Sequence, residues 1–339
     1  MKKKTACVTG ITGQTASYLT EILLNKGFTV YGIKRRSSNL NTQRIDHLYN
    51  NSNLKLVYGD LSDYSSVASL VNEIKPTHFY NMGAMSHVRV SFDIPIYTMD
   101  VTGTGVLRCL EAIKRHSPGT RFVQMSSSEM FGSSAPPQNE ETLFHPRSPY
   151  AVAKVAGYWS TVNYREAYNL FAANAIMFNH EGPKRGETFV TRKITRAATR
   201  IKLGLQDKLS LGNLDSKRDW SHSYDIANAV YLISEADSPS DYVAASGETH
   251  SVKEFLEMVF SKLDLNWKDY VVFDPKYTRP SEVDVLCGDP SKIKKELGWE
   301  AKYSFADLID EMISEDMKLA KKEKILLNSK EKILLNSNE

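Results

Sequence analysis

The sequence is poor in cysteine. Its 339 residues include three, Cys7, Cys109 and Cys287, which lie far apart and form no CxxC or Cys/His spacing. A disulfide framework or a zinc site needs closely and regularly spaced ligands. The eight histidines show no metal-ligand spacing either. We therefore expect no metal and a reducing compartment.

Long hydrophobic runs and an excess of one charge are also missing. No run approaches the ~18 apolar residues that a membrane-spanning helix needs. The apolar run after the basic residues 2–4 ends at Gly10, which is too early for a signal peptide. The net charge of +3 is too balanced for binding nucleic acid or a membrane surface. These absences predict a cytoplasmic protein with no nucleic-acid partner and no membrane partner.

Short β-like runs alternate with amphipathic segments through the first half of the chain. The predicted strands are 5–9, 29–34, 54–58, 77–81, 121–126 and 172–178. The predicted helices between them are 17–26, 64–74, 97–116 and 149–168. This alternation predicts an α/β fold of Rossmann type, with a doubly wound parallel sheet. Ligands of such sheets bind at the carboxyl ends of the strands.

The pattern changes after Asn179, and the remainder predicts a smaller C-terminal substrate-binding domain. A loop is followed by a helix over 190–205 with a regular apolar face. We expect the following division: a cofactor-binding domain over 1–180 with a returning segment near 212–245, a substrate-binding domain over 181–211 and 246–321, and a tail over 322–339.

The tail contains the octapeptide KEKILLNS twice in succession, at 322–329 and 330–337. An eight-residue repeat turns the apolar cluster by about 80° per copy on a helix of 3.6 residues per turn. It therefore makes no continuous apolar stripe. We expect a frayed or disordered extension, and a segment that docks on a neighbouring subunit is the alternative.

A glycine-rich turn, Gly10-Ile11-Thr12-Gly13-Gln14-Thr15-Ala16, joins the first strand to the first helix. In a dinucleotide-binding loop the first glycine permits the tight turn and the second lets the backbone approach the pyrophosphate. The pyrophosphate then lies on the helix N-terminus. The third position packs helix against strand and tolerates alanine, so Ala16 does not cancel the motif. A plain strand–helix turn is the alternative.

The end of the second strand bears on the choice of cofactor. An acidic residue there usually binds the ribose 2′-hydroxyl of NAD, but this chain has Arg35, Arg36 and Ser37. Guanidinium groups pair well with a 2′-phosphate, which favours NADP. A solvated basic turn is the alternative. Asp60 and Leu61 follow the third strand, where they can meet the adenine, although Asp60 could instead cap the next helix.

Tyr150 and Lys154 are four residues apart, so they share one helix face. Ser148 is a candidate N-cap of this helix, with Pro149 in its first turn. A tyrosine with a pKa of ~10 needs a shift of ~3 units, about 4 kcal/mol, to act as a base near pH 7. A lysine charge ~4 Å away contributes energy of that order. A surface i,i+4 pair is the alternative.

The fifth strand ends in Ser126-Ser127-Ser128-Glu129, where a hydroxyl can hold the substrate oxygen that Tyr150 deprotonates. With the glycine loop, the serine cluster and YxxxK in this order, the chain resembles the extended short-chain dehydrogenase/reductases. The stretches TGITGQ, GIKRRSSN, SSSEMFG, RSPYAVAK, FVTRKI, LGNLDSKRDW and RPSEVD extend the resemblance to the GDP-mannose 4,6-dehydratase family. It covers nearly everything except the tail.

The resemblance implies the conversion of GDP-mannose to GDP-4-keto-6-deoxymannose with NADP as a recycled cofactor. Tyr150 takes the proton of the sugar O4 while hydride leaves C4, and hydride later returns to C6. Glu129 removes the C5 proton and protonates the departing 6-hydroxyl, which makes the enzyme a carbon–oxygen lyase. Ser127 stands where the family usually has threonine. A solvent-facing carboxylate is the alternative for Glu129.

The resemblance also implies binding residues and an assembly. It adds Thr12 and Gln14 to the cofactor contacts. The implied substrate contacts are Ser86, Ser128, Asn179, Arg185, Val190, Lys193, Gly212, Asn213, Arg218, Arg279 and Glu282. For most of the stripe Arg192, Arg196 and Arg200 we expect a solvated face. A homodimer or homotetramer is expected, because in the family the loop over 35–41 reaches a neighbouring subunit's cofactor.

Two other functions fit the same sequence. The first is a nucleotide-sugar epimerase or decarboxylase of the same fold, of which an epimerase has no need of an acid at Glu129. The second is a catalytically idle NADP-binding regulatory protein. The intact set of Ser127, Glu129, Tyr150 and Lys154 argues against this second function.

Overall fold

A seven-stranded sheet forms the centre of the computed structural model, which describes residues 4–277 and 281–336. The strand order is β11-β6-β5-β4-β1-β2-β3, and every neighbouring pair is parallel. The strands are β1 (Thr5–Thr9), β2 (Thr29–Lys34), β3 (Leu54–Tyr58), β4 (His78–Asn81), β5 (Arg121–Ser127), β6 (Ala172–Met177) and β11 (Asp241–Ala244). The predicted fold class is confirmed. The seventh strand, β11, lies in the segment expected to return to the sheet.

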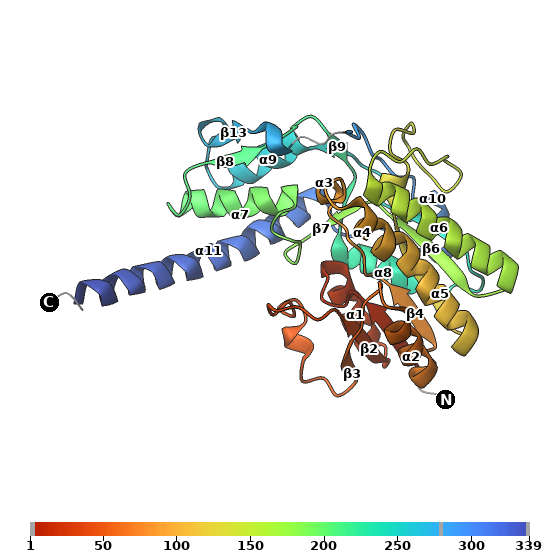
Figure 1. Cartoon of the computed structure of the whole chain (residues 1–339). Coiled ribbons are helices and arrows are strands. Elements are labelled where there is room, and N and C mark those ends of the chain that lie inside the picture. The colour runs from red at the N-terminus through yellow and green to blue at the C-terminus, as the bar shows by residue number, and fades with distance from the viewer. Residues whose placement is uncertain (1–3, 278–280, 337–339) are drawn as a thin grey trace.

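Helices cover both faces of the sheet, as Figure 1 shows. On one face lie α1 (Gln14–Asn25) and α8 (Ser223–Glu235), and on the other lie α2 (Tyr64–Ile74), α5 (Gly105–His116) and α6 (Pro149–Tyr168). Each face of the sheet has its own hydrophobic core, and successive side chains of a strand enter these two cores in turn because a strand has a period of two residues. In β1, Ala6 and Val8 enter the first core while Cys7 enters the second.

The helix predicted over 97–116 is more complex than expected. It consists of α4 (Pro95–Met99), a π-helical turn η2 (Asp100–Thr104) and α5, which follow one another without a break. Short elements near the strand ends are η1 (Asp46–Leu48), α3 (Val88–Ser91) and η3 (Ser128–Met130). The last of these follows β5 directly.

A smaller part lies above the carboxyl edge of the sheet and has its own core, which includes Trp220, Phe255 and Met312. Its strand pairs are β7 (Asn179–Glu181) with β10 (Trp220–His222), β8 (Leu209–Leu211) with β13 (Val271–Phe273), and β9 (Lys217–Arg218) with β12 (His250–Ser251). Its helices are α7 (Val190–Lys202), α9 (Val252–Lys262), η4 (Trp267–Asp269), η5 (Pro275–Tyr277) and α11 (Phe305–Asn336). Helix α10 (Ser291–Leu297) instead packs against β11 of the central sheet.

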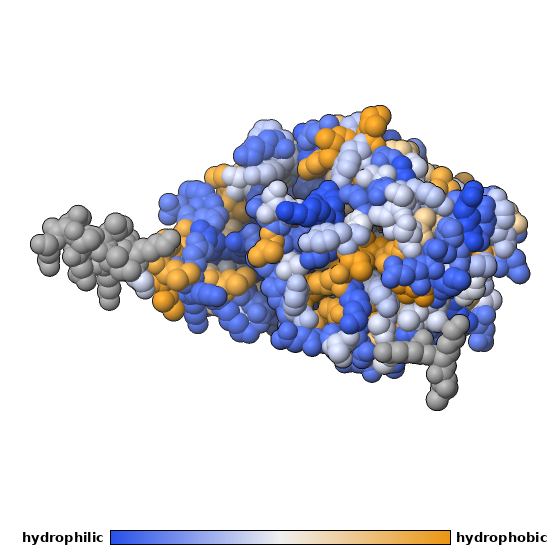
Figure 2. All heavy atoms as spheres, turned by 60° about the horizontal axis from the view of Figure 1, so that its bottom comes forward, coloured by the Kyte–Doolittle hydropathy of each residue, from blue (hydrophilic) through white to orange (hydrophobic). Residues whose placement is uncertain are grey.

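The expectation of an irregular tail is wrong for the described residues. Helix α11 runs to Asn336 and so includes most of both octapeptides. Lysine, glutamate and leucine are good helix formers, and the helix is already nucleated by its packing against α7. Glu323 pairs with Arg200, and Lys324 donates to the Leu203 carbonyl at 2.8 Å. Beyond them α11 leaves the body, where Figure 2 shows exposed hydrophobic atoms at the left of the view.

Three further features bear on function. Over residues 4–277 and 281–336, no helix combines the length and the apolar character that crossing a membrane requires. Within the same ranges, no group of three or more His, Cys, Asp or Glu side chains is arranged to hold a metal ion. The three cysteines form no disulfide, and Cys7 and Cys109 are buried in the core.

Candidate active site

A cavity of about 700 Å³ lies at the carboxyl edge of the central sheet, between the sheet and the smaller part. Its floor comes from the ends of β1, β5 and β6, and its opposite wall comes from α7, the residues after β8, and β9. This is the edge at which ligands of doubly wound sheets bind.

Most of the predicted site residues line this cavity, although they come from distant parts of the chain. From the catalytic and cofactor sets these are Gly10, Gly13, Gln14, Ser127, Glu129, Tyr150 and Lys154. From the substrate set they are Ser86, Ser128, Asn179, Arg185, Val190, Lys193, Gly212, Asn213, Arg218 and Glu282.

Other predicted residues lie outside the cavity wall. These are Thr12, Arg35, Arg36, Ser37, Asp60 and Leu61. Arg35 and Arg36 are exposed after β2, where Arg35 donates to the Tyr97 hydroxyl at 2.7 Å and Arg36 donates to the Ser37 carbonyl. Arg279 lies outside the described residues. Their roles in binding stay predictions.

The glycine loop has the geometry that its sequence predicts. Gly10 has a φ of 61°, and a Cβ atom there would lie 2.8 Å from the Gly83 Cα. Gly13 is the N-cap of α1 and has no side chain that could bind the helix's first N–H groups. Ala16 is buried in the core under this turn. The loop therefore leaves room and helix N–H donors for an anion.

Asp60 is not the cap of the second helix. Asp63 is the N-cap of α2 and accepts hydrogen bonds from the Ser65 and Ser66 N–H groups. Asp60 instead accepts from the N–H and hydroxyl of Ser62 at 2.9 and 2.8 Å. The capping alternative considered for Asp60 is therefore wrong.

The four candidate catalytic side chains come from three consecutive elements, β5, η3 and α6. Ser127 ends β5, and its Oγ accepts from the Glu129 N–H at 3.3 Å. Tyr150 and Lys154 lie on α6, whose N-cap is Ser148, as predicted. All four side chains are at least nine-tenths buried. The cavity therefore holds two hydroxyls, a carboxylate and an amine away from bulk water.

The predicted effect of Lys154 on Tyr150 is wrong for the protein as it stands in this structure. Burial raises the pKa of Tyr150 to about 12, against a lowering effect of the Ser127 hydrogen bond. Burial also lowers the pKa of Lys154 to about 8. The Lys154 Nζ donates to the Met125 carbonyl at 2.5 Å and lies 5.7 Å from the Tyr150 ring centroid. Desolvation outweighs the attraction that sequence spacing suggested.

The opposite wall carries cations that are held by neighbours. Arg185 pairs with the buried Glu181 at 3.0 Å and stacks 3.6 Å from the Phe189 ring centroid. Arg218 lies 3.4 Å from Glu282. The Asn179 Oδ1 is buried and has no hydrogen-bond partner among the described residues. Such fixed charges and an unmatched amide suit a polar, anionic ligand.

Sequence reasoning missed several aromatic and histidine side chains of the cavity. Lys193 Nζ lies 3.3 Å from the Tyr277 ring centroid, and His87 packs against Phe189 with ring centroids 5.2 Å apart. His180 also lines the cavity, where burial lowers its pKa to about 4. Phe189 lies within the stretch FVTRKI, but nothing in the spacing of these side chains distinguished them as cavity residues.

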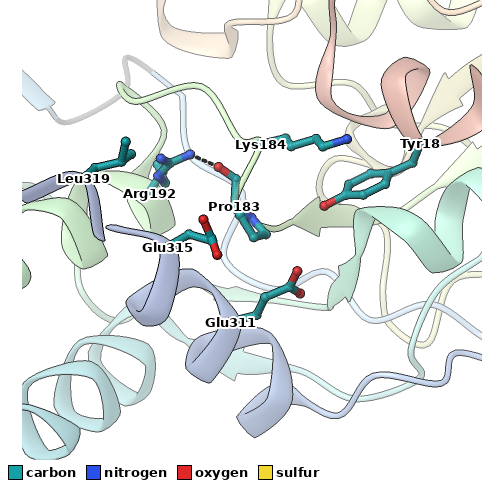
Figure 3. Close-up of a pocket in the computed structure, with 7 residues that line it drawn as sticks. All are labelled: Tyr18, Pro183, Lys184, Arg192, Glu311, Glu315 and Leu319. Carbon is teal, nitrogen blue, oxygen red and sulfur yellow. Dashed lines mark hydrogen bonds between the residues drawn. The ribbon is translucent and has the colours of Figure 1, made fainter. Parts of the chain in front are cut away.

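A second pocket, of about 300 Å³, lies outside this cavity between α1, α7 and α11, as Figure 3 shows. It is lined by Arg192, one of the three arginines expected on a solvated face. That expectation is wrong for Arg192, which is 5% exposed and pairs with Asp316 at 2.7 Å. Arg196 and Arg200 are half-buried and pair with Glu187 and Glu323.

The sheet, the glycine loop and the serine, tyrosine and lysine in one cavity are those of a short-chain dehydrogenase/reductase. The family model of GDP-mannose 4,6 dehydratase matches residues 7–312, and the chain belongs to that family. GDP-mannose 4,6 dehydratase 1 of Arabidopsis thaliana is 55% identical over 334 residues, which are 96% of this chain and 92% of the relative. The Homo sapiens GDP-mannose 4,6 dehydratase is 48% identical, over 94% of this chain and 93% of the relative.

Solved structures agree with the fold. RMD from Pseudomonas aeruginosa complexed with NADPH superposes with a TM-score of 0.77 at 22% sequence identity. The match covers 93% of this chain and 99% of that one. At this level of identity the likeness bears on the fold alone.

Proposed function

We propose that this chain is an NADP-dependent dehydratase that converts GDP-mannose to GDP-4-keto-6-deoxymannose. The observation that carries the proposal is one cavity that joins Ser127, Glu129, Tyr150 and Lys154 to a wall of cations from the smaller part. Relatives named GDP-mannose 4,6 dehydratase, matched over nearly their whole length, support it. The proposed cofactor half is residues 1–180 with a returning segment near 212–245, and the proposed substrate half is 181–211 with 246–321. The start of the returning segment, up to β10, packs in the core of the smaller part, so the return to the sheet begins with α8.

The glycine loop fits a dinucleotide. A side chain at Gly10 would collide with the Gly83 backbone, and the uncapped N-terminus of α1 offers N–H donors to a pyrophosphate. The Gln14 Oε1, which also lines the cavity, is a buried acceptor without a partner among the described residues. The arginines after β2 support NADP, because guanidinium groups pair well with a 2′-phosphate. When bound, NADP supplies reversible hydride transfer at the sugar.

The protein's own groups move the protons. Tyr150, held by Ser127, takes the proton of the sugar O4, and the Ser127 hydroxyl holds the same oxygen. The ketone formed at C4 acidifies the C5 hydrogen. Glu129 removes that proton and delivers one to the departing 6-hydroxyl. Both transfers need a carboxylate inside the cavity, and the Glu129 side chain, which is 6% exposed, lies there. Lys154 would stabilise the ionised tyrosine when its amine turns from the Met125 carbonyl toward Tyr150.

The opposite wall binds the nucleotide. Arg185, Arg218 and Asn179 meet the diphosphate and sugar, and Glu282 binds the ribose. Lys193 and Val190 contact the guanine, and the Tyr277 ring beside Lys193 extends this surface. Ser86, Ser128, Gly212 and Asn213 complete the pocket. Fixed cations suit a diphosphate because charge-assisted hydrogen bonds are stronger than neutral ones.

A homodimer or homotetramer in the cytoplasm completes the proposal. Several large apolar side chains are exposed on α4, α5 and α6, among them Ile96 at 83% and Trp159 at 57%. Exposed apolar groups on adjoining elements mark association surfaces. Leu40, at the surface of the loop over 35–41, is 88% exposed, which supports contact of that loop with a neighbouring subunit. The unpaired cysteines suit a reducing compartment.

The test is incubation of the protein with GDP-mannose and NADP in deuterated water, followed by NMR of the product. Dehydration with Glu129 as the acid–base group predicts solvent deuterium at C5 and a 6-deoxy-4-keto sugar. An epimer that carries no deuterium at C5 would identify an epimerase and contradict the proposal. A protein that binds NADP but leaves GDP-mannose unchanged would be the idle regulatory protein.

A further inference from the structure

The loop between β7 and α7 carries Arg185 into the cavity wall, and other arginines hold its backbone. Arg192 Nη1 donates to the carbonyl oxygens of Pro183 and Arg185, the latter at 3.1 Å. Arg44 Nε donates to the carbonyl oxygen between them, that of Lys184, at 2.5 Å. Figure 3 shows Arg192 reaching the Pro183 carbonyl. Three successive carbonyls of the loop are therefore fixed by guanidinium groups.

Arg192 is itself held by a carboxylate of the C-terminal helix. Its Nε lies 2.7 and 2.9 Å from the two carboxylate oxygens of Asp316, which is 2% exposed. Thr195 also donates to Asp316, at 2.6 Å. A buried pair of this kind is costly to break, because removing one partner leaves an uncompensated charge. Asp316 thus fixes the orientation of the Arg192 guanidinium, whose Nη1 donates to the loop carbonyls.

The loop is also a place where cations crowd together. Burial and the neighbouring Arg192 and Arg185 lower the pKa of Arg44. Two buried carboxylates offset this repulsion, Glu181 beside Arg185 and Asp316 beside Arg192. Without Asp316, the Arg192 charge would repel Arg185 through a dry region, and the loop would shift to separate them.

We propose that Asp316 and Arg192 are a positioning pair that sets the substrate affinity of the cavity by holding the Arg185 loop in place. This rests on the proposed function, in which Arg185 binds the diphosphate of GDP-mannose. No described residue of α11 lines the cavity, yet through Asp316 this helix controls a cation that does. The pair acts on binding and leaves the chemical step at Tyr150 and Glu129 unchanged.

The experiment compares Asp316→Asn with the wild-type protein. The variant keeps the shape of the side chain and removes its charge. We expect the KM for GDP-mannose and the Kd for GDP, measured by calorimetry, to rise about tenfold, while kcat stays within about twofold. The Kd for NADPH should be unchanged. The matched control is Asp310→Asn on the same helix, whose exposed carboxylate pairs with Lys262 at 2.7 Å. It should leave all four values unchanged.

A double-mutant cycle separates positioning from general stability. If Asp316 acts through Arg185, the Asp316→Asn change should raise the GDP Kd less in an Arg185→Lys background than in the wild-type protein. The reason is that both changes weaken the same contact, that of Arg185 with the diphosphate. Additive effects, or an unchanged GDP Kd in a folded Asp316→Asn protein, overturn the proposal. If Asp316→Asn does not fold, Arg192→Lys replaces it. Lysine keeps the positive charge but cannot bind Asp316 and the loop carbonyls at the same time, so the same rise in the GDP Kd is expected. The GDP Kd can be measured without catalysis. A wild-type protein that lacks dehydratase activity would therefore contradict the proposed function, and the double-mutant cycle would still test the role of Asp316.

Discussion

At the scale of single residues, the four catalytic candidates show how far side-chain type and spacing lead. The i,i+4 spacing of Tyr150 and Lys154 correctly placed both on one helix face and in one cavity. It did not predict that Lys154 donates to the Met125 carbonyl, or that burial raises the pKa of Tyr150 to about 12. Sequence spacing predicts which side chains lie close together on a helix. The effect of desolvation on their pKa values depends on every element packed around them.

Glu129→Gln tests the proton transfer at C5. Because the amide cannot accept the proton, we expect kcat to fall by roughly 10²–10⁴, the usual contribution of a positioned acid–base group. Solvent exchange at C5, followed by NMR, should slow in parallel. The Kd for NADPH should stay within about twofold of the wild-type value.

The matched control is Glu141→Gln, which removes an exposed carboxylate twelve positions further along the chain. It should retain full activity. Water loss at the wild-type rate in Glu129→Gln would show that another group carries the proton.

At the scale of elements, the predicted strands and helices correspond closely to those observed, and the differences have local causes. The helix over 149–168 was predictable because Ser148 and Pro149 begin it and the residues after them suit a helix. The π-helical turn η2 was not, since no residue pattern announces one extra residue in a turn. The stripe of Arg192, Arg196 and Arg200 was misjudged because α11, far away in sequence, covers that side of α7.

Gly10→Ala tests the turn after β1. Alanine at a φ of 61° is strained, and its Cβ would lie 2.8 Å from the Gly83 Cα. We expect a loss of roughly 1–3 kcal/mol in the free energy of unfolding, as strained backbone positions cost. The displaced loop should also weaken NADPH binding at least tenfold, as measured by calorimetry.

The control for this variant is Gly27→Ala, whose φ of 80° is also left-handed but whose Cβ would meet no atom within 4 Å. It lies after α1, at the other edge of the sheet. It should cost about 1–2 kcal/mol of stability and leave NADPH binding unchanged. Equal losses of NADPH affinity in the two variants would contradict a role of the Gly10 turn in binding.

At the scale of the whole molecule, three cores packed against the central sheet and a further core in the smaller part surround the cavity. His78 is the first residue of β4, at the amino edge of the central sheet, and is 4% exposed. Burial lowers its pKa to about 4, even though Glu235 lies 2.9 Å from its Nε2. The folded protein therefore keeps His78 neutral at pH values where the unfolded chain binds a proton.

This buried histidine predicts a loss of stability in mild acid. The unfolded pKa is about 6.5, so stability contributed by the neutral form is fully present above that pH and is lost as the pH falls toward 4. The expected loss is roughly 3 kcal/mol, which urea unfolding at a series of pH values would measure.

His78→Phe should remove about half of the dependence between pH 6.5 and 4, because the buried His180, whose pKa is also lowered to about 4, keeps its own contribution. The control His47→Gln, at an exposed histidine, should keep the wild-type slope. An unchanged slope in His78→Phe would assign the acid sensitivity to other groups.

The sequence by itself determined the parallel sheet, the glycine turn and the identities of the reactive groups, because these follow from local periodicity, backbone freedom and side-chain chemistry. Only the tertiary structure decided that residues as distant as Gly10, Glu129 and Arg218 share one cavity, that Tyr150 is desolvated, and that Asp316 on the last helix holds Arg192. These are contacts between segments far apart in the chain. Their energies depend on burial and on neighbouring charge, which no local pattern of residues records.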